Sequence, residues 1–135
     1  MPDLTYPRFE GRRVLIVEDE YVIAMEIAGI LEDCGAEIVG PAGSVSLAIQ
    51  LIAQEAPIDA AVLDVNLGRE RVFPVAETLN LRNIPFVFAT GYDASLLVGF
   101  ETSPRLEKPL DPRAMAWTIS KLVDSGDGGR GRPFV

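Results

Sequence analysis

Short apolar runs alternate with stretches of helical periodicity along most of the chain. The runs predict strands at residues 13–17, 37–39, 58–63, 86–89 and 105–107. Most of them are largely apolar at consecutive positions, which is typical of strands that are covered on both faces, whereas the last, Arg-Leu-Glu, is brief and has one apolar residue. Strands that alternate with helices form parallel sheets with right-handed crossovers. The pattern therefore predicts an α/β fold, a doubly wound five-stranded sheet with helices on both faces.

The segments between the strands carry start and stop signals for helices. Ser44 and Asp111 are predicted N-caps of the second and the last helix. A third helix is expected to begin near Phe73, with Pro74 tolerated in its first turn, and Gly35 ends the first helix. The inward positions of the first helix are Ile23, Ile27, Ile30 and Leu31, those of the second Val45, Ala48, Ile49 and Ile52, and those of the last Met115, Ile119 and Leu122.

The composition excludes several functions. The 135 residues are 48% hydrophobic and 24% charged, which suits one soluble globular domain. The formal charge is −8 and the basic residues do not cluster, so we expect no nucleic-acid partner. Without histidine, Ser-His-Asp catalysis and most zinc sites are excluded. The single cysteine, Cys34, can form no intrachain disulfide, and we interpret it as a half-buried packing residue.

The two ends of the chain differ in composition from its middle. We expect residues 1–10 to be an N-terminal extension, 11–124 the folded domain and the Gly-rich residues 125–135 a flexible tail. The first residues lack the apolar core and cleavage pattern of a signal peptide. No apolar run approaches the roughly 18 residues of a membrane span. We therefore expect a cytoplasmic protein that makes no membrane contact.

Polar side chains stand where four of the predicted strands end. Glu18 and Asp19 follow the first strand, Asp64 the third, Thr90 the fourth and Lys108 the fifth. Ligands of a doubly wound sheet bind beyond the C-terminal ends of its strands, so these side chains should converge on one site. Each of them is ordinary alone, since an acidic pair often lies in a solvated loop and a lone Asp is often an N-cap. Their joint occurrence carries the prediction.

Three carboxylates in one place favour a divalent cation. Crowded carboxylates repel one another, and Mg²⁺ prefers a few carboxylates together with water and phosphate oxygens. Asp19 and Asp64 are the expected direct ligands. Glu18 is expected to bind directly or through water, and the backbone carbonyl of Asn66 is expected to be a further ligand. The sequence therefore predicts a magnesium site.

The same site suits phosphoryl transfer. Asp64 is the candidate nucleophile, which would become an aspartyl phosphate. Thr90 supplies a hydroxyl donor and Lys108 a positive charge for the phosphoryl oxygens. Phosphoryl transfer requires mainly positioning and charge neutralisation, and this set of side chains provides both.

At these residues the chain resembles the receiver domain of two-component response regulators. The resemblance covers residues 11–124, through VLIVEDE (14–20), AVLDVNLG (61–68), Thr90 and the Lys108–Pro109 pair. It implies a flavodoxin-like sheet of order 2-1-3-4-5 and a cis Lys108–Pro109 bond. It also implies that Asp64 is phosphorylated by a sensor histidine kinase or a phosphotransfer protein.

A narrower motif precedes the last strand. Phe88-Ala89-Thr90-Gly91-Tyr92 resembles the Phe-Ala-Thr-Gly-X-Tyr (FATGUY) subgroup, although it is one residue shorter. The resemblance implies a single-domain regulator served by an HWE-type histidine kinase.

The chain departs from ordinary receivers at one position. Arg105 stands where they carry the aromatic ring that moves inward on phosphorylation, and we interpret it as a solvated side chain. Tyr92 is the candidate replacement for that ring, with the alternative that it only packs. Gly91 and Gly99 flank a segment in which a short helix is expected at residues 94–98, and they would let it reorder.

The predicted site is compatible with three candidate functions. The first is a phospho-switch that signals by protein contact, phosphorelay or phosphate-sink action, with no enzymatic turnover beyond phosphorylation of its own Asp64. The second is a small Mg²⁺-dependent aspartate-nucleophile phosphatase. Such enzymes usually carry Asp-X-Asp, where this chain has Asp64-Val65-Asn66, and they need a cap for their substrate. The third is an unphosphorylated interaction module, against which the retention of every key side chain argues.

Overall fold

A five-stranded parallel sheet forms the centre of the computed structural model, which describes residues 6–91 and 97–126. Its order, β2-β1-β3-β6-β7, corresponds to 2-1-3-4-5 when the strands of this sheet are counted along the chain. The strands are β1 (Arg13–Val17), β2 (Glu37–Ala42), β3 (Ala60–Asp64), β6 (Phe86–Thr90) and β7 (Arg105–Glu107). The predicted fold class and strand order are confirmed.

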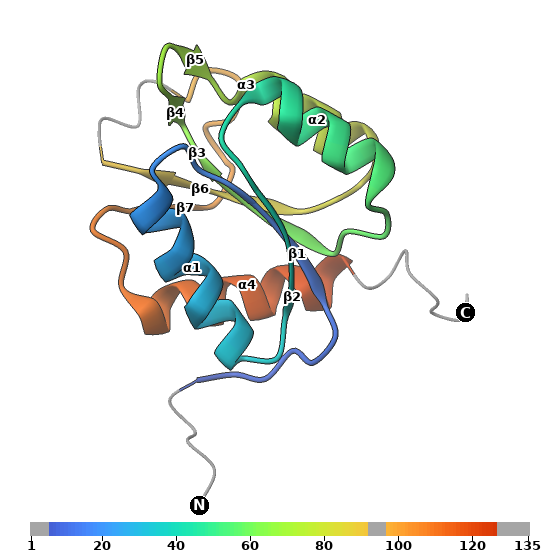
Figure 1. Cartoon of the computed structure of the whole chain (residues 1–135), viewed down its shortest axis with the longest axis vertical. Coiled ribbons are helices and arrows are strands. Elements are labelled where there is room, and N and C mark those ends of the chain that lie inside the picture. The colour runs from blue at the N-terminus through green and yellow to red at the C-terminus, as the bar shows by residue number, and fades with distance from the viewer. Residues whose placement is uncertain (1–5, 92–96, 127–135) are drawn as a thin grey trace, which may run out of the picture.

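Helices cover both faces of this sheet (Figure 1). One face carries α1 (Tyr21–Asp33) and α4 (Pro112–Gly126), and the other carries α2 (Val45–Gln54) and α3 (Phe73–Leu81). Successive side chains of a strand point to opposite faces. In β1, Val14 and Ile16 therefore pack under α1 and α4, whereas Leu15 and Val17 pack under α2 and α3. Two separate apolar layers result.

The predicted helix signals are confirmed. The hydroxyl of Ser44 accepts a hydrogen bond from the Leu47 amide at 3.1 Å, and a carboxylate oxygen of Asp111 accepts one from Ala114 at 3.1 Å. Gly35 has a φ of 96° just after α1, a conformation that a side chain would disfavour. The Lys108–Pro109 peptide bond is cis, as the resemblance implied.

Two segments differ from the sequence prediction. Strand β2 continues past residue 39, through Gly40 and Pro41 to Ala42, with an irregularity in its register against β1. The segment after Asp64, which the sequence suggested was a loop, contains a small antiparallel hairpin of β4 (Asn66–Leu67) and β5 (Glu70–Arg71). Gly-Pro is normally a stop signal and two-residue strands leave no periodicity, so neither feature has a sequence signature.

The N-terminal segment packs on the domain. Phe9 is buried in the α1–α4 layer, and its amide donates a hydrogen bond to the carbonyl of Cys34 at 2.9 Å. Cys34 itself is buried rather than half-buried. The last helix ends at Gly126, and the expected tail beyond it lies outside the described residues. The expected helix at residues 94–98 falls mostly outside them too, and its two described residues, Leu97 and Val98, are not helical.

Candidate metal centre at the carboxyl edge of the sheet

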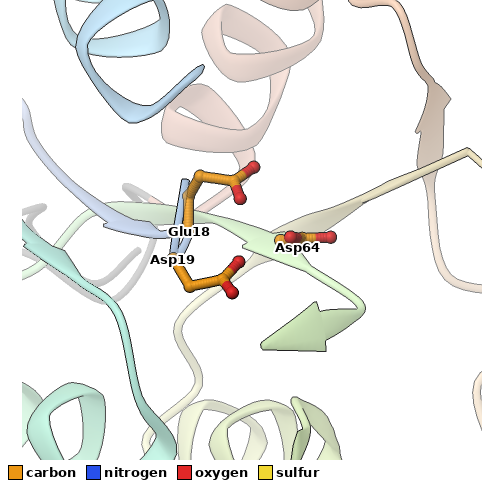
Figure 2. A group of neighbouring side chains, drawn as sticks. All are labelled: Glu18, Asp19 and Asp64. Carbon is orange, nitrogen blue, oxygen red and sulfur yellow. The ribbon is translucent and has the colours of Figure 1, made fainter. Parts of the chain in front are cut away.

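Three carboxylates meet at the C-terminal edge of the sheet. Strands β1 and β3 pair side by side with Val17 opposite Leu63, so the residues that end or follow these strands are neighbours. Glu18, Asp19 and Asp64 each offer an oxygen, and these oxygens lie within 4.8 Å of one another. Figure 2 shows the Glu18 and Asp19 side chains extending from the end of β1 on the same side as Asp64. The three carboxylates therefore lie together, as the sequence predicts.

The three carboxylates differ in exposure. Glu18 and Asp64 are buried, with 3% and 7% of their surface exposed, whereas Asp19 is exposed. Asp19 and Asp64 both face an open hollow, through which a ligand can reach Asp64. The hollow is lined by Asp19, Glu20, Asp64, Asn66, Gly68, Gly91 and Lys108.

Lys108, which follows the edge strand β7, contacts two of these carboxylates. Its Nζ lies 3.0 Å from Oε1 of Glu18 and 3.4 Å from Oδ1 of Asp64. The Lys108 amide donates a hydrogen bond to the carbonyl of Thr90 at 2.9 Å, which fixes the start of the loop after β7. A Cβ built at Gly91 would lie 3.8 Å from Cβ of Lys108, so the chain after β6 passes close to the base of this side chain.

Burial and charge set the protonation of the site. The pKa of Glu18 is raised to about 7: burial is the largest cause, the hydrogen bond with Asp64 acts in the same direction, and the hydrogen bond with Lys108 opposes the rise. Burial alone would lower the pKa of Lys108, but its contacts with Glu18 and Asp64 outweigh burial and raise it. Lys108 therefore stays positively charged while Glu18 and Asp64 compete for it.

The donor set fits a hard divalent cation. Three carboxylates face a single ammonium group, so the cluster carries excess negative charge when all three are ionised. Asn66 lies beside them, and its backbone N–H donates a hydrogen bond to Oδ1 of Asp64 at 3.3 Å. Its side-chain oxygen is buried and has no hydrogen-bond partner among the described residues. Oxygen donors of this kind suit Mg²⁺, which keeps several waters or phosphate oxygens.

Three further residues were singled out from the sequence, namely Thr90, Tyr92 and Arg105. Thr90 is buried at the end of β6, directly after Ala89, which is paired with Asp64. Tyr92 lies outside the described residues. Arg105 is exposed in β7, as we interpreted it from the sequence.

The surroundings of Asp19 were not apparent from the sequence. Gly43, before α2, lies against its backbone, since a Cβ built there would be 3.6 Å from its Cα. Gly68, in the β4–β5 turn with a φ of 61°, lies against its carboxylate, 3.7 Å from Oδ2 by the same measure. The only available signal was the isolated Gly68 between short apolar runs, which marks a turn without indicating what the turn contacts.

A parallel sheet in this order, with an acidic cluster and a lysine at its carboxyl edge, defines a flavodoxin-like domain of the receiver class. Such a site brings carboxylate oxygens that suit a cation and a positive charge within reach of one another. This is a set of groups suited to anionic phosphate chemistry.

Comparisons with known proteins agree with this class. No family model matches the chain. It is 35% identical over 109 residues to the transcriptional regulatory protein PdtaR of Mycobacterium tuberculosis, covering 80% of this chain and 49% of that protein. It is 26% identical over 114 residues to the phyllosphere-induced regulator PhyR of Methylorubrum extorquens, covering 82% of this chain and 43% of that protein. The chain thus spans about half the length of these curated relatives.

Solved structures give the same result at the level of the single domain. The REC domain of the PhyR response regulator of Erythrobacter litoralis aligns with a TM-score of 0.76 and 26% identity, over 93% of this chain and 97% of that one. A response regulator receiver protein of Sinorhizobium medicae has the same fold, with a TM-score of 0.77 and 24% identity over 87% of this chain and 98% of that one. The chain therefore contains a receiver domain of the response-regulator family.

Proposed function

We propose that the protein is a response regulator whose receiver domain accepts a phosphoryl group on Asp64 in a Mg²⁺-dependent reaction. The observation that carries the proposal is the position of Asp64. Its carboxylate faces an open hollow, 3.4 Å from the ammonium group of Lys108 and within 4.8 Å of the oxygens of Glu18 and Asp19.

In this proposal Asp19, Asp64 and the carbonyl of Asn66 hold Mg²⁺, and Glu18 binds it directly or through water. The bound ion would supply positive charge between the nucleophile and the phosphoryl oxygens. Either form of binding would be favoured by an ionised Glu18, so loading of the site would be accompanied by loss of the proton that burial favours there.

The transfer itself would be made by the chain's own residues. An oxygen of Asp64 forms a bond to phosphorus while the bond between phosphorus and the donor's histidine nitrogen breaks. The released imidazole takes up a proton from solvent, so no cofactor is oxidised or reduced. Lys108 leaves its carboxylate partners for a phosphoryl oxygen, and the hydroxyl of Thr90 donates a hydrogen bond to another.

The donor is a sensor histidine kinase, of the HWE type if the FATGUY resemblance holds, or a phosphotransfer protein. The phosphorylated domain would then signal by protein contact, relay the phosphoryl group or act as a phosphate sink in the cytoplasm. A regulatory output is supported by the similarity to the anti-anti-sigma factor PhyR of Bartonella quintana. None of the helices among residues 6–91 and 97–126 has the length and apolarity that crossing a membrane requires.

A groove beside the site suits the donor. It lies between α1 and the start of α4, and one of its walls is Lys108 itself, so it adjoins the candidate metal centre. Tyr21 and Val22, at the start of α1, are 69% and 70% exposed. An amphipathic helix laid in such a groove would bring its own side chains to the hollow. The groove is lined by Ile23, Glu26, Ile27, Ile30, Lys108, Pro109, Leu110, Pro112 and Met115.

Acetyl phosphate labelling tests the acceptor. With Mg²⁺, the wild-type protein should gain the mass of one phosphoryl group, and Asp64→Asn should gain none. Asp124→Asn, which changes an exposed carboxylate of α4, should label like the wild type. A labelled Asp64→Asn protein would overturn the assignment. An unlabelled wild-type protein would favour an unphosphorylated interaction module.

Turnover separates the proposal from a phosphatase. Incubation with an aryl phosphate should release no more product than the stoichiometric amount of one adduct per chain. Sustained, catalytic release that depends on Asp64 would instead favour the aspartate-nucleophile phosphatase.

A further inference from the structure

We propose that Glu70 is a positioning residue for the metal centre, because it anchors the wall of the hollow that faces Asp19. This inference rests on the proposed Mg²⁺ function of the site. Glu70 lies in β5 and is not one of the residues that line the hollow. It acts, in this proposal, through the hairpin and the start of α2.

The contact joins two elements that are distant in sequence. Oε1 of Glu70 accepts a hydrogen bond from the backbone amide of Val45, the first residue of α2, at 3.2 Å. The first amides of a helix have no partner within the helix. Ser44 satisfies the amide of Leu47, and Glu70 satisfies that of Val45. A carboxylate at this end of a helix is also favoured by the helix dipole.

Each end of this contact lies two residues along the chain from a glycine that is close to Asp19. Gly43 is the residue before the N-cap of α2 and lies near the Asp19 backbone, while Gly68 in the hairpin turn lies near the Asp19 carboxylate. The hydrogen bond between Glu70 and Val45 therefore links the two segments that approach Asp19, whose own side chain is exposed.

The hairpin is anchored independently only at its base. Leu67 is buried in the α2–α3 layer, and the amide of Val72 donates a hydrogen bond to the carbonyl of Val65 at 3.1 Å. Residues 68–71, at and after the turn, are exposed. Of the described contacts, the Glu70 hydrogen bond alone ties this exposed end of the hairpin to another element. Removing it should loosen Gly68 without unfolding the domain.

The test compares Glu70→Ala with Glu70→Gln, whose amide oxygen can still accept the Val45 hydrogen bond. Glu77→Ala, an exposed change on α3, is the matched control. In Mg²⁺-free buffer, hydrogen exchange of the Val45 amide should be faster in Glu70→Ala, while that of Leu47 stays as in the wild type. By calorimetry, Mg²⁺ affinity of Glu70→Ala should fall about three- to fivefold, as expected for loss of one charged contact at a helix end. Glu70→Gln should keep most of the affinity.

Acetyl phosphate labelling completes the design. Glu70→Ala should label more slowly than the wild type at limiting Mg²⁺ and at the same rate at saturating Mg²⁺. Equal Mg²⁺ affinities for Glu70→Ala and Glu77→Ala would overturn the positioning role. A wild-type protein that binds Mg²⁺ but is never labelled would instead count against the phosphoacceptor proposal, while the affinity comparison would still decide the role of Glu70.

Discussion

Glu18 is the residue whose chemistry depends most on its surroundings. It follows β1 directly, is 3% exposed, and receives hydrogen bonds from both Lys108 and the backbone amide of Glu20. Burial nevertheless dominates, and the pKa of its carboxyl rises to about 7. Near neutral pH, Glu18 therefore gains and loses its proton. When the proton is lost, the pocket acquires the negative charge that favours a cation.

This shift predicts a pH dependence of the metal-free protein. Between the ordinary pKa of 4.5 and the raised value of about 7, the native protein holds a proton on Glu18 that the unfolded chain has lost. Stability should therefore fall as pH rises through this window, by about 1 to 3 kcal/mol. Denaturant unfolding of the wild type and of Glu18→Gln at several pH values measures it. The variant should show a flatter profile, and two parallel profiles would contradict the shift.

The affinity for Mg²⁺ should depend on pH in the opposite direction, and should increase where the stability of the metal-free protein decreases. Because the ion binds an ionised Glu18, the apparent Mg²⁺ affinity should rise with pH up to about 7 and then level off. Calorimetry in buffers of different ionisation enthalpy would detect the proton released on binding. No proton release near pH 6 would show that Glu18 is already ionised in the metal-free protein.

Among the elements, α3 and β6 are joined by the ring of Phe100, which lies between β6 and β7. Phe100 stacks on Phe73, with ring centroids 5.5 Å apart and planes at 10°. It also meets Phe88 edge-on at 5.5 Å. Phe73 begins α3, shortly after the hairpin, and Phe88 precedes Thr90 by two residues. The same ring thus contacts the elements that follow Asp64 and that carry Thr90.

Phe100→Ala should destabilise the domain by about 2 kcal/mol, less than the about 3 to 5 kcal/mol typical of a fully buried Phe, because the ring is only partly buried. Urea unfolding measures the loss. Val98→Ala, in the same segment but 76% exposed, should cost no more than about 0.5 kcal/mol. Equal stabilities for the two variants would show that the ring cluster does not hold this segment.

Some of the elements could be predicted from the sequence and others could not. Strand β1 begins and ends where its apolar run does, β7 has its predicted bounds, and Ser44 and Asp111 cap helices as predicted. Glu18, Asp19, Asp64 and Lys108 come together as predicted, because each ends or follows a strand and sheet topology brings these ends to one edge. Glu70 was missed, since it reaches α2 only through a hairpin whose strands are too short to leave a pattern.

Across the whole molecule, the two faces of the sheet have different surroundings. The α1–α4 face adjoins the groove that ends at Lys108, and the α2–α3 face carries the aromatic cluster and the Glu70 contact. The proposed donor groove and the Glu70 contact therefore lie on separate faces of the sheet.

This separation predicts that a substitution can slow phosphotransfer from the kinase without changing the rate of labelling by acetyl phosphate. Val22→Glu should reduce phosphotransfer from the cognate kinase about tenfold, the effect of losing about 1.4 kcal/mol of binding. Labelling by acetyl phosphate should be unchanged, because Val22 is 70% exposed and does not line the hollow. Leu81→Glu, 86% exposed on the opposite face, is the control and should leave both reactions as in the wild type. Equal kinase rates for the two variants would place docking elsewhere.

The most direct test of the account is a crystal structure of the protein with beryllofluoride, a phosphoryl mimic, and with Mn²⁺ in place of Mg²⁺. We predict an anomalous peak coordinated by Asp19, Asp64 and the carbonyl of Asn66. The mimic should be joined to the Asp64 carboxylate and contacted by Lys108. Mn²⁺ bound away from these oxygens, or a mimic attached to another carboxylate, would contradict it.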